Sequence, residues 1–411
     1  MNSDIPRSRL ADVALRQRAE ATGLALQHSI DALLGQLARA GARDQKGLQA
    51  VLKLSQSAVS RLMTSTRSSD PLATLFAIPG QEALRQMLKG AAQHGATSDA
   101  IARVDEAISG FERFIDVDMG DRATLEAVLS DWAQESRATF ELRHKTAAFK
   151  SVSALRGVQA QLVLNTGILY PSATNPTYHD CIGIDALLGC RRTRPSGVLR
   201  VCSSSMAADG AHFTASGIGG QAVHNMADML LPQYSTISTD EIEVASHGHI
   251  VETAVSGLPL GRADGHGGDL VFAMLYRNLH RARRGSGGPT SGLGGQAEPP
   301  SEAYIVDALL HEDVWPGVVP EVRLYDTVVR GIAHPDDPAR VGDRLDMLES
   351  VQFLGRGPAA FRMPEFPQYS ELIRHVCETQ GWDAERLRGY RCKVRYPIYG
   401  SQIGLAFTLP V

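Results

Sequence analysis

The segment GARDQKGLQAVLKLSQSAVSRLMTSTR, residues 41–67, carries the strongest structural signal in the chain. Five apolar positions have the spacing of two short helices and the turn between them: Leu48, Leu52, Leu54, Val59 and Leu62. Burial of these side chains predicts the elbow of two helices that cross at a steep angle. Ser55 precedes the second helix, and we expect its hydroxyl to accept a hydrogen bond from the backbone N–H of Ser57 or Ala58.

The second helix of this segment has one short face that is polar and basic. If Val59, Leu62 and Met63 are buried, the exposed residues carry no carboxylate and are Gln56, Ser57, Ser60, Arg61 and Thr64. Gln pairs with adenine, Arg pairs with guanine and Ser bonds to almost any base edge, so this face suits the major groove of DNA. Gln45 and Lys46, at the start of the first helix, are expected to reach phosphates together with the backbone N–H groups there.

The stretch LKLSQSAVSRLM (52–63), preceded by QKGLQA, resembles the helix-turn-helix of the lambda repressor and Cro family, whose second helix reads the major groove. The resemblance covers about residues 29–93, because SSDPLATLFAIPGQEALRQML (68–88) stands where such domains carry closing helices. It implies that Gln45, Gln56, Ser57, Ser60 and Arg61 occupy DNA-contact positions. Lys53 stands where the family often has Gly, which implies a left-handed backbone that costs on the order of 1 kcal/mol.

The sequence around this segment favours helices as far as residue 157. Apolar residues recur at spacings of three and four between Leu10 and Gly41, which predicts one or two amphipathic helices. Further helices are predicted at 44–53, 56–65, 71–77, 81–93, 98–115 and 122–155. We therefore predict a helix-turn-helix domain over residues 1–95 and a helical connector or dimerisation segment over 96–157.

After Gly157 the composition changes to strand-forming segments with few helices between them. Strands are predicted at 158–170, 196–204, 240–256, 269–276, 303–310, 320–331, 389–400 and 402–410, and helices near 220–231 and 368–380. This order predicts an α+β domain over 158–411 with a mostly antiparallel sheet, acting as an effector or oligomerisation domain. Within it, residues 281–300 contain six glycines and three prolines, which predicts a mobile loop.

The overall composition is that of a globular protein, with 43% hydrophobic and 21% charged residues. No run of 18 apolar residues occurs, the N-terminus is polar and the five cysteines form no CxxC pair, so we expect a cytoplasmic protein without a membrane partner. Residues 1–95 carry 12 Lys and Arg against 7 Asp and Glu, although the whole chain has a net charge of -4. The basic N-terminal part is where a polyanion would bind.

The sequence predicts no catalytic residue, no metal and no cofactor. His179 and Cys181 could form a nucleophile pair, but we interpret them as a turn histidine beside a buried thiol. His247 and His249 have the spacing of metal ligands on a strand, without a third ligand fixed by spacing. The alternating basic residues of 391–395 are interpreted as an edge strand protected by charge rather than as an anion pocket.

These observations support two functional hypotheses of different classes. The first is a sequence-specific transcriptional regulator, a repressor, that binds double-stranded DNA as a homodimer and responds to a small-molecule effector. Inverted half-sites about 34 Å apart are then expected, because one recognition helix makes too few contacts for tight binding. The alternative is a small-molecule-binding protein or enzyme whose helical N-terminus is only an assembly module. DNA binding without transcriptional output is a third possibility.

Overall fold

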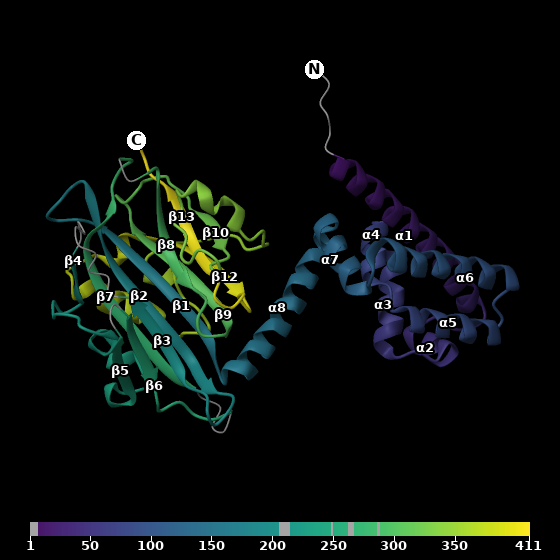
Figure 1. Cartoon of the computed structure of the whole chain (residues 1–411), viewed down its shortest axis with the longest axis horizontal. Helices are drawn as coiled ribbons and strands as arrows, with labels where there is room; N and C mark the ends of the chain where they lie inside the picture. The colour runs from purple at the N-terminus through teal and green to yellow at the C-terminus, as the bar shows by residue number, and fades with distance from the viewer. Residues whose placement is uncertain (1–6, 205–213, 248–249, 262–266, 286–287) are drawn as a thin grey trace, which may run out of the picture. The chain divides into compact units, whose positions relative to one another are not determined.

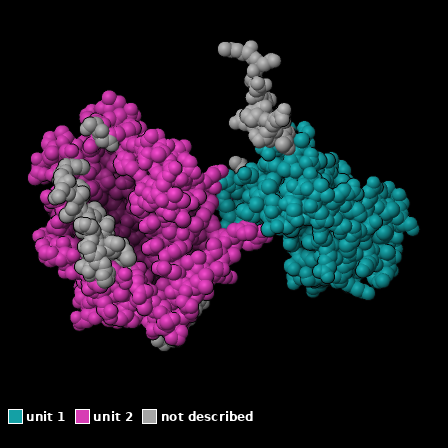
Figure 2. Space-filling view, in the orientation of Figure 1, with its two compact units in different colours: residues 1–141 teal, residues 142–411 magenta. Residues whose placement is uncertain are grey.

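The computed structural model describes residues 7–204, 214–247, 250–261, 267–285 and 288–411. The chain forms two compact units, unit 1 (Met1–Glu141) and unit 2 (Leu142–Val411), which are coloured separately in Figure 2. Unit 1 is helical, and unit 2 is an α+β unit built on mostly antiparallel sheets, as the sequence predicted (Figure 1). The division between the units falls after Glu141, whereas the sequence placed boundaries after residues 95 and 157.

Unit 1 is built from consecutive helices joined by short turns. They are α1 (Arg7–Arg39), α2 (Gln45–Leu52), α3 (Gln56–Arg67), α4 (Pro71–Ala77), α5 (Gln81–Gln93), α6 (Ser98–Arg113), the π-helical turn η1 (Phe114–Met119), α7 (Arg122–Trp132) and the first part of α8 (Gln134–Arg156). The four short helices predicted between residues 44 and 93 are confirmed, each end within two residues.

Short polar side chains determine where most of these helices begin. The N-cap residues Asp44, Ser55, Asp70, Thr97 and Asp121 each accept a hydrogen bond from a backbone N–H in the first turn of their helix. Such caps satisfy donors that the helix itself leaves unpaired. The single helix predicted over 122–155 is wrong, because the chain breaks at Ala133, which is extended (φ -123°, ψ 100°) and buried in the core of unit 1.

One apolar core runs through unit 1 from α1 to the end of α7. Leu26 and Ile30 of α1 belong to the same buried cluster as Ile108 of α6 and Leu129 of α7. The first part of the predicted connector, as far as Ala133, is therefore an integral part of the helical unit. The reason is that α6 and α7 each bury one apolar face against the helices that precede them.

Glycines let helices of unit 1 approach each other at backbone distance. A Cβ added to Gly90 of α5 would lie 2.7 Å from the carbonyl oxygen of Val51 in α2. A Cβ added to Gly23 of α1 would lie 2.1 Å from the carbonyl oxygen of Pro71 in α4. Both distances are shorter than real Cβ contacts, so any larger residue requires the paired helices to separate.

The described part of unit 2 contains three sheets, the second part of α8 and the helix α9. The seven-stranded sheet has the order β11-β12-β9-β1-β2-β7-β4, and the two three-stranded sheets have the orders β10-β13-β8 and β3-β6-β5. The strands are β1 (Val158–Pro171), β2 (Tyr178–Arg192), β3 (Leu199–Ser204), β4 (Thr214–Gly217), β5 (Ile242–His247), β6 (Ile250–Val255), β7 (Gly268–Arg281), β8 (Thr290–Gln296), β9 (Ser301–His311), β10 (Glu321–Tyr325), β11 (Gln352–Arg356), β12 (Leu387–Arg395) and β13 (Gln402–Thr408). Helix α9 spans Tyr369–Glu378.

The interior strand β9 is buried on both faces of the large sheet. Val306 and Leu310 face one apolar cluster, to which both small sheets contribute, and Ile305 and Leu309 face the other, to which α9 contributes. The alternation follows from the two-residue period of a strand. Pairing of β9 with β1 is parallel, while the remaining pairs of the large sheet are antiparallel.

Three local predictions for unit 2 are corrected by the structure. Residues 281–300 are not a loop throughout, because Thr290–Gln296 form β8 and pair with β13. Main-chain hydrogen bonds to β13 order this glycine-rich segment, which has few side chains to bury. The predicted strand 240–256 is a hairpin of β5 and β6, and the helix predicted near 220–231 is limited to the 3-10 turn η2 (Met226–Met229).

No helix within the described part of the chain is long and apolar enough to span a bilayer.

The close approach of α5 to α2 generates a prediction about stability. We expect Gly90→Ala to destabilise unit 1 by about 1–3 kcal/mol, because the added methyl group forces α5 away from the end of α2. Amide hydrogen exchange in α2 and α5, followed by mass spectrometry, measures the effect. The matched control is Gly35→Ala in α1, where no atom lies within 4 Å of the added Cβ. It should stabilise the helix by about 0.5–1 kcal/mol, and equal protection in both variants would contradict the packing argument.

Candidate nucleic-acid interface

The elbow predicted between α2 and α3 is present. All five predicted apolar side chains, Leu48, Leu52, Leu54, Val59 and Leu62, are buried, with exposed fractions between 0 and 8%. Lys53 has the left-handed conformation that the family resemblance implied, with φ 52° and ψ 36°. Ser55 caps α3 by accepting a hydrogen bond from the backbone N–H of Ala58 at 3.2 Å. The local fold of residues 45–67 is therefore that of two short helices joined by a tight turn.

The polar face predicted for α3 is exposed to solvent. Its five residues, Gln56, Ser57, Ser60, Arg61 and Thr64, are all exposed, while Val59 and Leu62 on the opposite side are fully buried. At the start of α2, Lys46 is exposed and Gln45 is half-buried. Neither α2 nor α3 contains a carboxylate. The structure thus brings the predicted residues together on two adjacent helices of one unit.

Hydrogen bonds at the start of α3 divide these residues into held and open side chains. Gln45 Nε2 donates to the carbonyl of Gln56 at 3.2 Å and so ties the two helix starts together. The hydroxyl of Thr64 donates to the carbonyl of Ser60 at 3.0 Å, within the helix. The side chains of Gln56, Ser60 and Lys46 make no hydrogen bond or ion pair with any residue that the structure describes, and remain available to a ligand.

Arg61 has a second role that sequence reasoning missed. Its Nε donates to the carbonyl of Ala77 at 3.0 Å, and its Nη2 donates to the carbonyl of Ile78 at 2.8 Å. Arg122 of α7 donates to the same Ile78 carbonyl at 3.1 Å. The two guanidinium groups satisfy carbonyls that the short helix α4 leaves unpaired at its C-terminus. Arg61 is therefore exposed, but its guanidinium is held in place by two hydrogen bonds. The N–H groups of Nη1 do not take part in these two bonds.

The start of α2 differs from what the sequence suggested. We expected its backbone N–H groups to reach a phosphate, but the Asp44 carboxylate accepts from the N–H of Gly47 at 2.8 Å. A carboxylate at this position occupies one backbone donor and would repel a phosphate, whereas the Lys46 ammonium remains open. Exposed basic side chains nevertheless dominate the segment: Arg43, Lys46, Lys53, Arg61 and Arg67. The acidic residues Asp44 and Asp70 next to them serve as helix caps.

Burial disfavours the alternative nucleophile pair of His179 and Cys181 in unit 2. Cys181 is buried, as predicted, and burial raises the pKa of its thiol to about 12, which disfavours the reactive thiolate. His179 lies in strand β2 and not in a turn, and its pKa is lowered to about 4 by burial. Asp180 is bound by Arg277 Nη1 at 2.7 Å and by the backbone N–H of Asn278 at 2.8 Å.

The edge strand that we predicted for the basic segment 391–395 is wrong at Arg391, which pairs with β11, whereas no described strand pairs with residues 392–395 on that side. The segment belongs to β12, which lies between β11 and β9 in the large sheet. Arg391 forms a buried bidentate ion pair with Asp307, at 2.8 and 2.7 Å, and Lys393 pairs with Glu365. These guanidinium and ammonium groups are neutralised inside the unit, so they form no anion pocket either. The charge pattern alone gave no sign of the partners, which lie far away in the sequence.

Metal binding has no support in the described residues. The pair His247 and His249 lies outside the residues whose side chains the structure describes. Elsewhere in the described part of the chain, no three His, Cys, Asp or Glu side chains are grouped so that they could hold a metal ion.

Comparison with known proteins adds little to this geometry. No family model matches the chain, and no curated protein matches it. One solved structure to which it is similar is described as a "putative protease" from Parabacteroides distasonis, with a TM-score of 0.28 and 9% sequence identity. The match covers 62% of this chain and 41% of that chain, so this chain spans less than half the length of that protein. A likeness this distant carries no argument about activity.

Two buried histidines on paired strands flank Trp315 in unit 2. His179 of β2 and His280 of β7 are cross-strand partners, and their rings lie 5.6 and 6.0 Å from the Trp315 ring. Burial lowers the pKa of each histidine from 6.5 to about 4. His280 Nδ1 shares a hydrogen bond with the Ser291 hydroxyl at 2.8 Å, whereas neither ring nitrogen of His179 has a partner among the described residues.

These histidines predict a loss of stability in acid. Because both pKa values are lower in the folded chain, protonation favours unfolding. Above pH 6.5 both histidines are neutral in the folded and in the unfolded chain, so the free energy of unfolding has its full value. As the pH falls towards 4, the free energy of unfolding decreases by about 3 kcal/mol for each residue. Urea unfolding followed by tryptophan fluorescence between pH 7.5 and 4 measures the decline. In His179→Phe we expect unchanged or greater stability at pH 7.5 and about half of the decline; a full decline in this variant would refute the assignment.

Proposed function

We propose that this chain is a sequence-specific DNA-binding transcriptional regulator, a repressor, whose α3 enters the major groove. The observation that carries the proposal is the exposed, carboxylate-free face of α3, set by burial of its opposite side in the elbow with α2. An α-helix fits the major groove, and side chains on its outer face can then reach base edges. The resemblance of residues 29–93 to the lambda repressor and Cro family supports the same assignment.

The residues of α2 and α3 that remain able to act on DNA have different roles in this proposal. Gln56 and Ser60 have open side chains, so they contact bases, with Ser57 beside them at the start of α3. Lys46 reaches a phosphate, which fixes the position of the helix without reading sequence. Gln45 orients the start of α3 through its bond to the Gln56 carbonyl. Arg61 uses the N–H groups that remain after its bonds to the end of α4.

The distribution of charge supports binding of a polyanion by unit 1. Basic side chains are exposed along and beside α2 and α3, and the carboxylates nearest to them cap helices. Residues 1–95 carry a net positive charge in an acidic chain. Neutralised DNA phosphates release counterions, so binding should weaken steeply as salt rises.

A homodimer is part of the proposal. A helix of 12 residues such as α3 offers few base contacts, and two copies on inverted half-sites about 34 Å apart would double them. Unit 2 is assigned the remaining tasks of a regulator, which are dimerisation or the sensing of a small-molecule effector.

The open side chains of the interface predict two different mutational effects. The full chain is first used to select sequences from a random duplex pool, and affinity for the selected site is then measured by fluorescence anisotropy. Gln56→Ala should cost about 1–3 kcal/mol and relax specificity at one base pair. Lys46→Ala should weaken binding to all sequences alike and reduce the salt dependence by about one counterion.

Matched controls come from exposed residues elsewhere in unit 1. Gln17→Ala in α1 and Lys89→Ala in α5 remove the same side chains from positions outside the α2–α3 face, and they should leave affinity unchanged. A pool without any enriched sequence contradicts the proposal. So does a Gln56→Ala chain that binds the selected site as tightly as the original.

Variants of Arg61 and Arg122 distinguish DNA contact by Arg61 from its role in holding the end of α4. We expect Arg61→Ala to weaken specific binding by roughly 1–3 kcal/mol. Arg122→Ala removes the neighbouring guanidinium from the Ile78 carbonyl without changing the face of α3. Anisotropy titrations should show a large loss in the first variant and a small loss in the second. Equal losses would mean that Arg61 acts by holding α4 and not by contacting DNA.

A further inference from the structure

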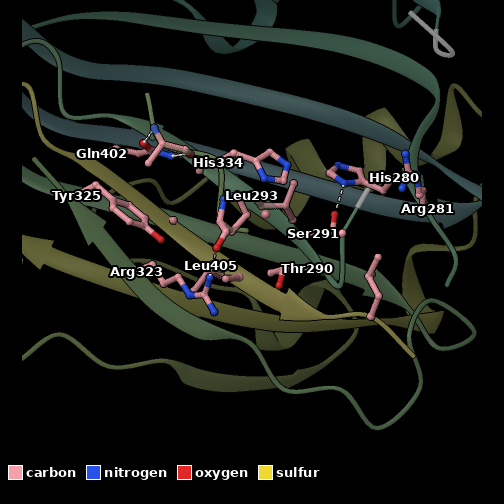
Figure 3. A pocket seen from close by; sticks show the side chains of 18 of the residues that line it. His280, Arg281, Thr290, Ser291, Leu293, Arg323, Tyr325, His334, Gln402 and Leu405 are labelled. Atoms are coloured by element: carbon pink, nitrogen blue, oxygen red, sulfur yellow. Dashed lines mark hydrogen bonds between the residues drawn. The ribbon is translucent and has the colours of Figure 1, made fainter. Parts of the chain in front are cut away.

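Unit 2 contains a cavity of about 420 Å³ beside the small sheet β10-β13-β8 (Figure 3). Residues of β7, β8, β10 and β13 line it, together with the segment Ala333–Pro335. Its volume lies within the range of about 300–1,000 Å³ that is typical of small-molecule sites. None of its lining residues belongs to the proposed DNA interface, so the cavity needs an explanation of its own.

Small residues on two paired strands create the cavity. Gly292 and Gly294 of β8 and Gly404 and Ala406 of β13 contribute backbone or a single methyl group where other strands carry larger side chains. The surrounding surface is apolar, since leucines supply much of it: Leu279, Leu293, Leu405 and Leu409. Leu405 and Leu409 are buried, whereas His334 is exposed, so the lining runs from the core of unit 2 to solvent.

The charged groups of the cavity are positive. Arg281 and Arg323 line it, and no carboxylate is among its lining residues in the described part of unit 2. Arg323 is already engaged, because its Nε and Nη2 donate to the Glu321 carboxylate at 3.3 Å, which Arg344 also binds, and its Nη1 donates to the carbonyl of Pro335 at 2.7 Å. The Arg281 guanidinium makes no hydrogen bond or ion pair with a described residue. Arg281 is therefore the arginine of the lining whose guanidinium is open to a ligand, and the neighbouring Asp336 carboxylate accepts a hydrogen bond from the backbone N–H of Thr290 at 2.8 Å.

We propose that this cavity binds a small organic carboxylate with an apolar body. The carboxylate pairs with the Arg281 guanidinium, whose fork geometry fits a carboxylate bidentately. In Figure 3, His280 and Ser291 lie beside Arg281, and Leu293 lies between them and Arg323, so the hydrocarbon part extends from Arg281 towards Leu293. Only the role of this ligand as an effector of DNA binding rests on the proposed function.

Neutral polar groups complete the site. The Ser291 hydroxyl is held by His280 Nδ1 at 2.8 Å, and His280 stays uncharged at neutral pH because burial lowers its pKa to about 4. The buried Tyr325 also lines the cavity. These groups offer hydrogen bonds to a carboxylate or hydroxyl without adding a second charge. They therefore contribute selectivity for shape and polarity, while Arg281 selects for the anion.

Calorimetric titration of the full chain tests the site with a defined series of probes. Butanoate, octanoate, dodecanoate and benzoate are compared with the amines and alcohols that have the same carbon skeletons. We expect at least one carboxylate to bind ten times more tightly than its alcohol, and the amines not to bind. If no carboxylate exceeds its alcohol and its amine, the proposal is overturned.

Variants place the bound carboxylate within the structure. Arg281→Met keeps the length of the side chain but removes the charge, and it should weaken carboxylate binding at least tenfold while leaving alcohol binding unchanged. Gly292→Leu should fill the cavity and weaken both ligand classes. The control is Arg374→Met on α9, an exposed arginine that does not line the cavity. If Arg281→Met and the control bind the carboxylate with equal affinity, the assignment of Arg281 as the carboxylate-binding residue is wrong.

The same samples distinguish this proposal from the proposed function. A chain that binds the carboxylate and binds no DNA retains the cavity assignment and loses the regulator assignment. A chain that binds DNA and no carboxylate does the reverse. If both bind, saturation with the tightest carboxylate should change the affinity for the selected DNA site at least threefold, and an unchanged affinity would overturn the effector role.

Discussion

Burial of the apolar side chains between α2 and α3 decides the direction in which every polar side chain of α3 points. Because Leu52, Val59 and Leu62 are fully buried, the opposite side of α3 faces solvent. The left-handed Lys53 makes the tight turn possible at a cost on the order of 1 kcal/mol. Each fully buried leucine or valine contributes about 1.5–3 kcal/mol, so the elbow is stable despite the strained residue. The proposed interface depends on this balance.

The end of α4 connects this elbow to the rest of unit 1. Arg61 of α3 and Arg122 of α7 donate to the same carbonyl, that of Ile78, and thereby fasten three helices at one point. This arrangement adds to the apolar burial that holds α7 in the helical unit, since α7 supplies one of the two guanidinium groups. It also makes Arg61 a bifunctional residue in the proposed interface, with one part of its hydrogen-bonding capacity already used inside the protein.

Sequence reasoning succeeded where the signal is local. The helix 71–77 was predicted to the residue because Asp70 and Pro71 mark its start, and the elbow followed from the spacing of five apolar residues. It failed where distant partners decide. The chain breaks at Ala133 without a glycine or proline, and β8 is a strand because β13 pairs with it. For the site, the local spacing of apolar residues predicted the exposed face of α3. It did not predict the hydrogen bonds of Arg61, because the carbonyls that accept them are 16 and 17 residues away.

The parallel pairing of β1 with β9 imposes an order on assembly during synthesis. Ala160 of β1 is the register partner of Ser301, so the central pair of the large sheet cannot form until nearly three quarters of the chain has been made. Unit 1, whose helices close over short loops, can complete its core long before that point. During synthesis, unit 1 can therefore be folded while the edge of β1 that pairs with β9 is still unpaired.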